Sequence, residues 1–170
     1  MQTPEGSISV EQVDFHDPVQ GAQLIELLNC YAVDPTGGAE PLSEYVRENL
    51  IEELKKRSFA YAFIAFEIKS CGTKNPVGLA LTFEGFSSFH SQGLLNIHDF
   101  VVKREHRGKG IGTLLLQEVE RFSIAKGFCK ITLEVLEKNF AAQNLYSKLG
   151  FGGYKLSEEY GSALFWSKSL

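Results

Sequence analysis

Three glycines with basic neighbours occupy one short segment, and this combination could bind an anion. The segment reads Arg107-Gly-Lys-Gly-Ile-Gly-Thr113 and follows an apolar run that ends at Val102. Apolar residues recur at helical spacing from Ile111, so the glycines lie where a strand ends and a helix begins. The first N–H groups of a helix are unpaired and partly positive, and glycines let a phosphate approach them. The segment therefore predicts a site for a diphosphate or a similar anion.

Two common phosphate-binding loops do not fit this segment. A Walker loop needs Gly-x-x-x-x-Gly-Lys followed by Ser or Thr, and the sequence contains no such run. A dinucleotide fingerprint needs Gly-x-Gly-x-x-Gly, but Thr113 stands where the third glycine would be. The pattern that fits is Arg-x-x-Gly-x-Gly, at Arg107, Gly110 and Gly112. Glycines that only allow tight packing between a strand and a helix are the alternative interpretation.

The elements around this segment must position it, and hydrophobic periodicity predicts their order as β-α-α-β-β-β-α-β-α-β-β. Helices are expected from Asp17 to Tyr31, from Pro41 or Ser43 to about Lys56, and over residues 111–126 and 140–149, the last with Asn139 as its N-cap. The two strands on either side of residues 72–76 should form an antiparallel hairpin. The predicted strands are residues 7–15, 59–68, 77–86, 94–102, 129–136, 154–157 and 162–168, with residues 158–161 as the last turn.

Two motifs together resemble the GNAT superfamily of acyl-CoA N-acyltransferases. The Arg-x-x-Gly-x-Gly run is similar to the coenzyme A pyrophosphate signature of that superfamily. The run from Asn139 to Phe151 resembles its segment Asn-x-x-Ala-x-x-Leu-Tyr-x-x-x-Gly-Phe, and the predicted element order is also similar. The resemblance implies an α+β (mixed α/β) fold: a twisted, mostly antiparallel sheet of six to seven strands with helices on both faces. It implies a single domain over residues 1–170.

The resemblance also implies an activity, the transfer of an acetyl group from acetyl-CoA to a primary amine within a ternary complex. Asn139 would hydrogen-bond the pantetheine arm, and Tyr146 would protonate the departing thiolate. The main chain at the strand end would pair with pantetheine, with the Val101 N–H as an oxyanion donor. An ordinary N-cap and a core aromatic residue are the alternatives for Asn139 and Tyr146. The implied cofactor-binding residues are Phe100, Val101, Val102, Arg107, Gly108, Lys109, Gly110, Ile111, Gly112, Thr113, Asn139 and Tyr146.

The base that deprotonates the amine has two candidates, His98 and Glu84. Strict strand alternation places His98 on one face and Asp99 on the other. An imidazole side chain can serve as a base near neutral pH, so His98 could take the proton directly or through water. Glu84 on the neighbouring strand is the rival, and a structural histidine and a solvated carboxylate are the plainer alternatives. The strand resembles that of polyamine and diamine acetyltransferases, which commonly carry Glu-Asp where this chain has His98-Asp99.

The acceptor is expected to be a small amine or amino acid, with a protein or peptide amine as the runner-up. It should bind between residues 31–42 and 86–93, where Tyr31, Phe86 and Phe89 offer aromatic walls. A non-catalytic acyl-CoA-binding module is the alternative from another class, but binding alone would not require Tyr146. Residues 160–166 are apolar enough to allow a homodimer.

Composition and charge narrow the partners and the location. A net charge of −4 argues against a nucleic-acid partner. No apolar run approaches the ~18 residues of a membrane-spanning helix, and the N-terminal residues lack the features of a signal peptide. The three isolated cysteines predict reduced thiols and a cytoplasmic location. The four histidines have no metal-ligand spacing, so no metal is predicted.

Overall fold

The structure is a computed structural model that describes residues 2–3, 6–157, 159, 161–162 and 164–168. The chain divides into two compact units, Met1–Leu133 and Glu134–Leu170, which are described separately below. The single domain over residues 1–170 stays a prediction beside this division.

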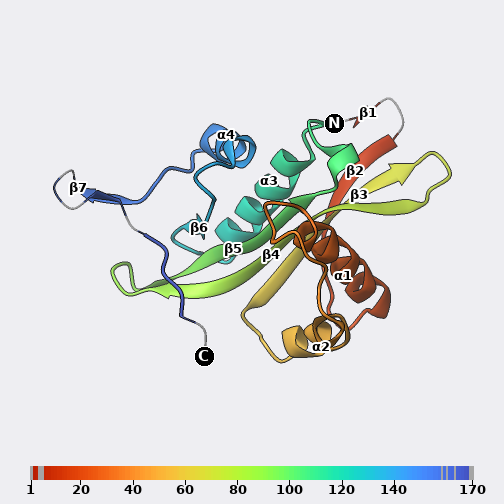
Figure 1. The fold of residues 1–170 in the computed structure, drawn as a ribbon, viewed down its shortest axis with the longest axis horizontal. Coiled ribbons are helices and arrows are strands. Elements are labelled where there is room, and N and C mark those ends of the chain that lie inside the picture. Colours follow the sequence, from red (N-terminus) through yellow and green to blue (C-terminus); the bar gives the residue numbers. More distant parts are fainter. Residues whose placement is uncertain (1, 4–5, 158, 160, 163, 169–170) are drawn as a thin grey trace. The chain divides into compact units, whose positions relative to one another are not determined.

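A six-stranded sheet forms the centre of the described part of the first unit (Figure 1). Its strands follow the chain in the order β1 to β6, and all neighbours are antiparallel except β5 and β6, which are parallel. The mixed, mostly antiparallel sheet and the predicted β3–β4 hairpin are thereby confirmed. The strands are β1 (Gln2–Thr3), β2 (Gly6–Gln12), β3 (Ala60–Lys69), β4 (Lys74–Ser87), β5 (Gln92–Val102) and β6 (Ile131–Leu133).

Local sequence signals set the helices of this unit, α1 (Pro18–Ala32), α2 (Glu44–Lys55) and α3 (Ile111–Ala125). Asp17 caps α1 by accepting hydrogen bonds from the main-chain N–H groups of Val19 and Gln20, and Ser43 caps α2 through Val46 N–H. Of the two predicted starts for α2, Ser43 is therefore the one observed. After Lys126 caps α3, the chain turns at Gly127, which has φ +73°.

Different helices cover the two faces of the sheet (Figure 1). α1 and α2 contribute Leu24, Leu27 and Leu54 to a core that contains alternate residues of β3 and β4. On the opposite face, Phe122 of α3 packs its ring against the rings of Tyr61 and Phe63, with centroid separations of 4.7 and 5.3 Å. Helices on both faces were predicted, and the structure confirms them. The α1/α2-face core residues in the strands are Ala60, Ala62, Ile64, Phe66, Leu79, Leu81 and Val101.

A bulge interrupts the ladder between β4 and β5. Leu81 pairs with Asp99, whereas the next residue, Thr82, pairs with Ile97, so His98 is an extra residue in β5. Because directly paired residues share a face of the sheet, Asp99 lies on the α1/α2 face with Leu81. The prediction of strict alternation across this strand is therefore wrong at His98.

Two strands at the edges of the sheet also differ from what the sequence predicts. The strand predicted over residues 129–136 is reduced to Ile131–Leu133, since its parallel register with β5 spans only three pairs. The structure adds a short strand, Gln2–Thr3, that the periodicity did not indicate.

The second unit contains the helix α4 (Phe140–Lys148) and a two-stranded sheet of β7 (Lys155–Ser157) and β8 (Gly161–Ser162). The Asn139 side chain accepts a hydrogen bond from Ala142 N–H at 3.2 Å, so the predicted N-cap is confirmed. The last strand was predicted over residues 162–168, but residues 164–168 are not in a strand, and Leu164, Phe165 and Trp166 are exposed. Of the predicted turn, Glu158 and Tyr160 lie outside the described residues.

Candidate functional site

The glycine turn leads directly into α3 and shapes the start of that helix. After the short 3₁₀ turn Arg104–His106, Gly108 has φ +76° and Gly110, the N-cap of α3, has φ +81°. Both angles are ones that L side chains rarely adopt, which explains the glycines. Gly110 provides no side-chain cap, so the first N–H groups of α3 lack one within the described chain. A Cβ at Gly108 would meet nothing within 4 Å, so there is open space beside this residue. Such a turn suits an anion.

The Arg107 side chain turns back from this loop. Its Nε donates to the Val102 carbonyl at 2.9 Å, and its NH2 group donates to Asp34 Oδ2 at 2.9 Å. Hydrogen bonds from the Thr36 main chain and hydroxyl, and then from Arg107, lower the Asp34 pKa to about 2. The guanidinium charge is thus balanced by a carboxylate, and Arg107 organises the turn through its side chain as well as its main chain. Lys109 is exposed in the same turn.

The register of β5 with β6 ends at the pair Ile97–Leu133, so the last residues of β5 extend beyond β6. Lys103 N–H donates to Val77 O of β4 at 2.9 Å. By the alternation of an antiparallel ladder, the main chain of Val101 faces β4 too, and that of Val102 faces the other edge.

One of the three predicted strand-end residues, Val101, is thereby placed differently from Phe100 and Val102. The Val101 N–H, expected as an oxyanion donor, is directed toward β4. Phe100 pairs with Ala80 and shares the main-chain orientation of Val102. The edge on which pantetheine was expected is therefore the one presented by Phe100 and Val102.

A half-buried carboxylate, Asp99, lies on the α1/α2 face of β5. Burial raises the Asp99 pKa, and the neighbouring His98 offsets part of that effect. Burial also raises the pKa of Tyr31 on α1, and the charges of Asp99 and Asp34 raise it further. Tyr31, Asp34 and Asp99 therefore form one acidic group beside the end of α1. Sequence reasoning did not select Asp99, because only the bulge brings it to the same face as His98.

The two predicted bases lie on opposite faces of the sheet. The exposed His98 packs its ring edge-on against Phe83 at 5.4 Å, and Phe83 packs against the α1/α2-face core. Glu84 instead accepts a hydrogen bond from Tyr61 Oη at 3.2 Å, and the Tyr61 ring packs against Phe122 of α3. The structure thus brings His98 close to Asp99 and does not bring Glu84 to them.

The predicted aromatic walls are also separated. Tyr31 packs against the α1/α2-face core near Asp99. Phe86 pairs with Gly93, five positions along β4 from the Leu81–Asp99 pair, which corresponds to about 17 Å of strand. Phe86 and Phe89 expose 67% and 99% of their surface. Of the three aromatic residues, Tyr31 is the one that the structure places close to Asp34 and Asp99.

Within the second unit, α4 holds the two other predicted residues on a short helix. Asn139 caps it, as described above, and Tyr146 is 8% exposed. The Tyr146 and Phe151 rings lie 5.9 Å apart. Both alternatives raised from the sequence, an N-cap and a packed aromatic residue, are therefore observed, and neither prevents a further role for these side chains.

The part of the chain that the structure describes contains no group of three or more His, Cys, Asp or Glu side chains that could hold a metal ion. None of its helices combines the length and apolar character required to cross a membrane.

The mostly antiparallel sheet with helices on both faces, and the glycine turn between β5 and α3, can now be compared with known proteins. Residues 23–151 match the model of the acetyltransferase (GNAT) family. The chain belongs to this family.

Curated relatives include enzymes named for small amine acceptors. Thialysine N-epsilon-acetyltransferase of Bos taurus is 34% identical over 74 residues, 44% of this chain and 43% of the relative. L-ornithine N5-acetyltransferase of Arabidopsis thaliana is 30% identical over 90 residues, 51% of this chain and 40% of the relative. The matched stretches thus span less than half of the length of these two relatives.

Solved structures share the fold along nearly the whole chain. A probable acetyltransferase superimposes with a TM-score of 0.75 at 17% identity, covering 95% of this chain and 99% of the other. An aminoglycoside acetyltransferase from an uncultured soil metagenomic sample has a TM-score of 0.70 at 22% identity, covering 96% and 99%. At these identities the likeness establishes the fold.

Proposed function

We propose that the protein is an N-acetyltransferase that moves an acetyl group from acetyl-CoA directly to a small primary amine. The observation that carries this proposal is the arrangement around the end of β5. There the glycine turn with its uncapped helix start, the end of β5 beyond its register with β6 and the half-buried Asp99 all belong to one stretch, residues 98–113. Each of the three features supplies something that the reaction needs.

The glycine turn and the strand edge fit the two polar parts of acetyl-CoA. The N–H groups of Ile111, Gly112 and Thr113, with Lys109 beside them, would bind the pyrophosphate. The Val102 N–H would donate to a pantetheine amide oxygen, while the Val102 carbonyl keeps its hydrogen bond from Arg107 Nε. Arg107 and Gly108 shape the turn, and Asn139 would hydrogen-bond the pantetheine arm.

Asp99 would do two things for the acceptor. Its carboxylate would attract the ammonium form of the amine and then accept a proton, leaving a neutral nucleophile. Its raised pKa makes it a stronger base than an ordinary aspartate, and His98 beside it could relay the proton to water. The lone pair on nitrogen then forms the N–C bond, the C–S bond breaks, and Tyr146 donates its proton to the thiolate. The nitrogen releases its second proton to water, and the Tyr146 phenolate takes up a proton from water, which restores the hydroxyl.

The carboxylate of Asp99 beside the end of α1 favours a cationic acceptor. Two relatives are named for acetylating a side-chain nitrogen of thialysine and of L-ornithine, which supports a diamine or diamino acid here. A protein or peptide amine is the second candidate, because a lysine side chain offers the same ammonium group. The homodimer and the cytoplasmic location remain predictions from the sequence.

Thiol release from acetyl-CoA tests the proposal. The protein should release thiol with diamines or diamino acids and do so more slowly with uncharged amines. Binding of acetyl-CoA with no release on any amine would instead favour the non-catalytic acyl-CoA-binding module.

A further inference from the structure

One side chain, Arg107, connects the glycine turn to the segment between α1 and α2. It precedes Gly108 directly, and its two donors reach in different directions, to Val102 O on β5 and to Asp34 Oδ2 after α1. The Asp34 side chain is 10% exposed, so the pair is largely shielded from water on its acidic side. A bidentate guanidinium holds a fixed geometry better than a flexible ammonium does.

The segment of residues 33–43 depends on Asp34 for its shape. Asp34 Oδ1 accepts hydrogen bonds from Thr36 N–H at 3.0 Å and from the Thr36 hydroxyl at 2.7 Å. The Asp34 carbonyl accepts from Gly37 N–H at 2.8 Å. A Cβ on Gly37 would lie 2.0 Å from Tyr31 O, so the turn is packed tightly against the end of α1. A displacement of Asp34 would therefore also displace Tyr31.

We propose that Asp34 is a positioning residue that couples the cofactor site to the acceptor site through Arg107. This inference rests on the proposed function. Cofactor bound at the glycine turn fixes the main chain of Arg107, the guanidinium then fixes Asp34, and Asp34 holds residues 33–43 with Tyr31 beside Asp99. Because coupling between two sites is reciprocal, acceptor bound at Tyr31 and Asp99 would also tighten the glycine turn.

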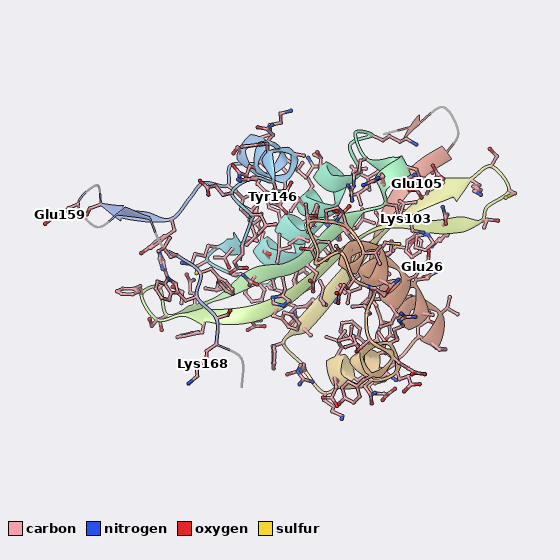
Figure 2. The ribbon with its side chains drawn as sticks, viewed as in Figure 1. Glu26, Lys103, Glu105, Tyr146, Glu159 and Lys168 are labelled. Atoms are coloured by element: carbon pink, nitrogen blue, oxygen red, sulfur yellow. The ribbon has the colours of Figure 1, made fainter. Side chains whose placement is uncertain are left out.

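A second ion pair offers a matched control. Lys103 Nζ lies 2.6 Å from Glu26 Oε1, and thus also joins the end of β5 to α1 (Figure 2). Glu26 lies within α1 and not in residues 33–43, and Lys103 precedes the glycine turn by several residues. Removing the ion pair of Lys103 and Glu26 eliminates a comparable surface interaction and leaves the contact between Arg107 and Asp34 intact.

Hydrogen exchange of residues 33–43, measured with and without coenzyme A, tests the coupling. In the wild type and in Glu26→Gln, coenzyme A should slow exchange by about tenfold, a typical coupling factor. In Asp34→Asn, coenzyme A should still bind by calorimetry but should not slow exchange there. Should Asp34→Asn fail to fold, Arg107→Lys is expected to show the same loss, since lysine cannot hold Val102 O and Asp34 together.

Three results separate the outcomes. A wild type that does not bind coenzyme A would overturn the proposed function and this inference with it. A wild type that binds it without slower exchange in residues 33–43 would overturn the inference alone. An Asp34→Asn variant that exchanges faster in both states, but keeps the same ratio between them, would show a purely structural role and would also overturn it.

Discussion

Asp99 of β5 pairs with Leu81 of β4, whereas the next pair joins Ile97 to Thr82, so β5 has one more residue than β4 between these two pairs. The bulge that causes this offset places the Asp99 carboxylate on the α1/α2 face, where Tyr31 lies. Without it, Asp99 would point to the α3 side of the sheet, away from the end of α1. The proposed acceptor site therefore depends on one extra residue, His98.

The first prediction concerns Asp99 as the base. Asp99→Asn should lower kcat/KM for a cationic amine by about 100-fold, because it removes both the charge and the proton acceptor. Since burial raises the Asp99 pKa, wild-type activity should fall as pH drops through a value above the ordinary aspartate range. The variant should lose that dependence in a pH–rate profile.

Glu84→Gln provides the comparison for Asp99→Asn. Glu84 lies on the α3 face and hydrogen-bonds Tyr61, so its replacement should change kcat/KM by less than about threefold. A large loss in Glu84→Gln together with full activity in Asp99→Asn would reverse the assignment of the base.

The second prediction concerns Tyr146 as the acid. Tyr146→Phe removes one hydroxyl and keeps the ring that packs against Phe151. We expect kcat to fall by about 100-fold while the dissociation constant of acetyl-CoA changes little, because the proton is needed only as the thiolate leaves. Steady-state kinetics and calorimetry on the same preparation measure both quantities. Unchanged kcat would leave Tyr146 a packing residue.

The third prediction separates backbone strain from cofactor binding at the glycine turn. Gly108 and Gly72 both have positive φ, +76° and +83°, and a Cβ at either would meet nothing within 4 Å. Gly108→Ala and Gly72→Ala should therefore each cost about 1 kcal/mol of unfolding free energy. Only Gly108→Ala should weaken acetyl-CoA binding, by about tenfold or more, since Gly72 lies in the β3–β4 turn. Equal affinities in the two variants would place the cofactor elsewhere.

The fourth prediction follows from the low pKa of Asp34. Its pKa is about 2 in the folded protein against an ordinary 3.8, so the folded state favours the ionised carboxylate. Wild type should exceed Asp34→Asn by roughly 1–2 kcal/mol in unfolding free energy above about pH 4. The difference should shrink as pH falls from about 4 to about 2, where the carboxylate takes up its proton. Urea unfolding at several pH values measures it, and a constant difference would contradict the assigned contacts.

Sequence patterns were sufficient for the features that depend on local signals. Asp17, Ser43 and Asn139 are N-caps that could be predicted from residue type and position. The glycine turn could be predicted too, since Gly108 and Gly110 adopt backbone angles that few other residues tolerate.

Features that depend on tertiary pairing could not be predicted in this way. A bulge such as that at His98 arises from the register between two strands, and nothing in residues 96–100 indicates which residue is extra. The ion pair of Arg107 with Asp34 joins positions 73 residues apart, so it depends on the fold as a whole. For the same reason, the sequence suggested a free cation at Arg107 where the structure has a neutralised one.

The central claim is that the protein acetylates a cationic small amine with acetyl-CoA. The most direct test is the rate of thiol release from acetyl-CoA with L-ornithine, lysine, diamines and uncharged amines of matched size. Turnover that favours the cationic amines, and that drops on Asp99→Asn, is the predicted result. A protein that binds no acetyl-CoA, or that acetylates uncharged amines as well as cationic ones, would contradict this account.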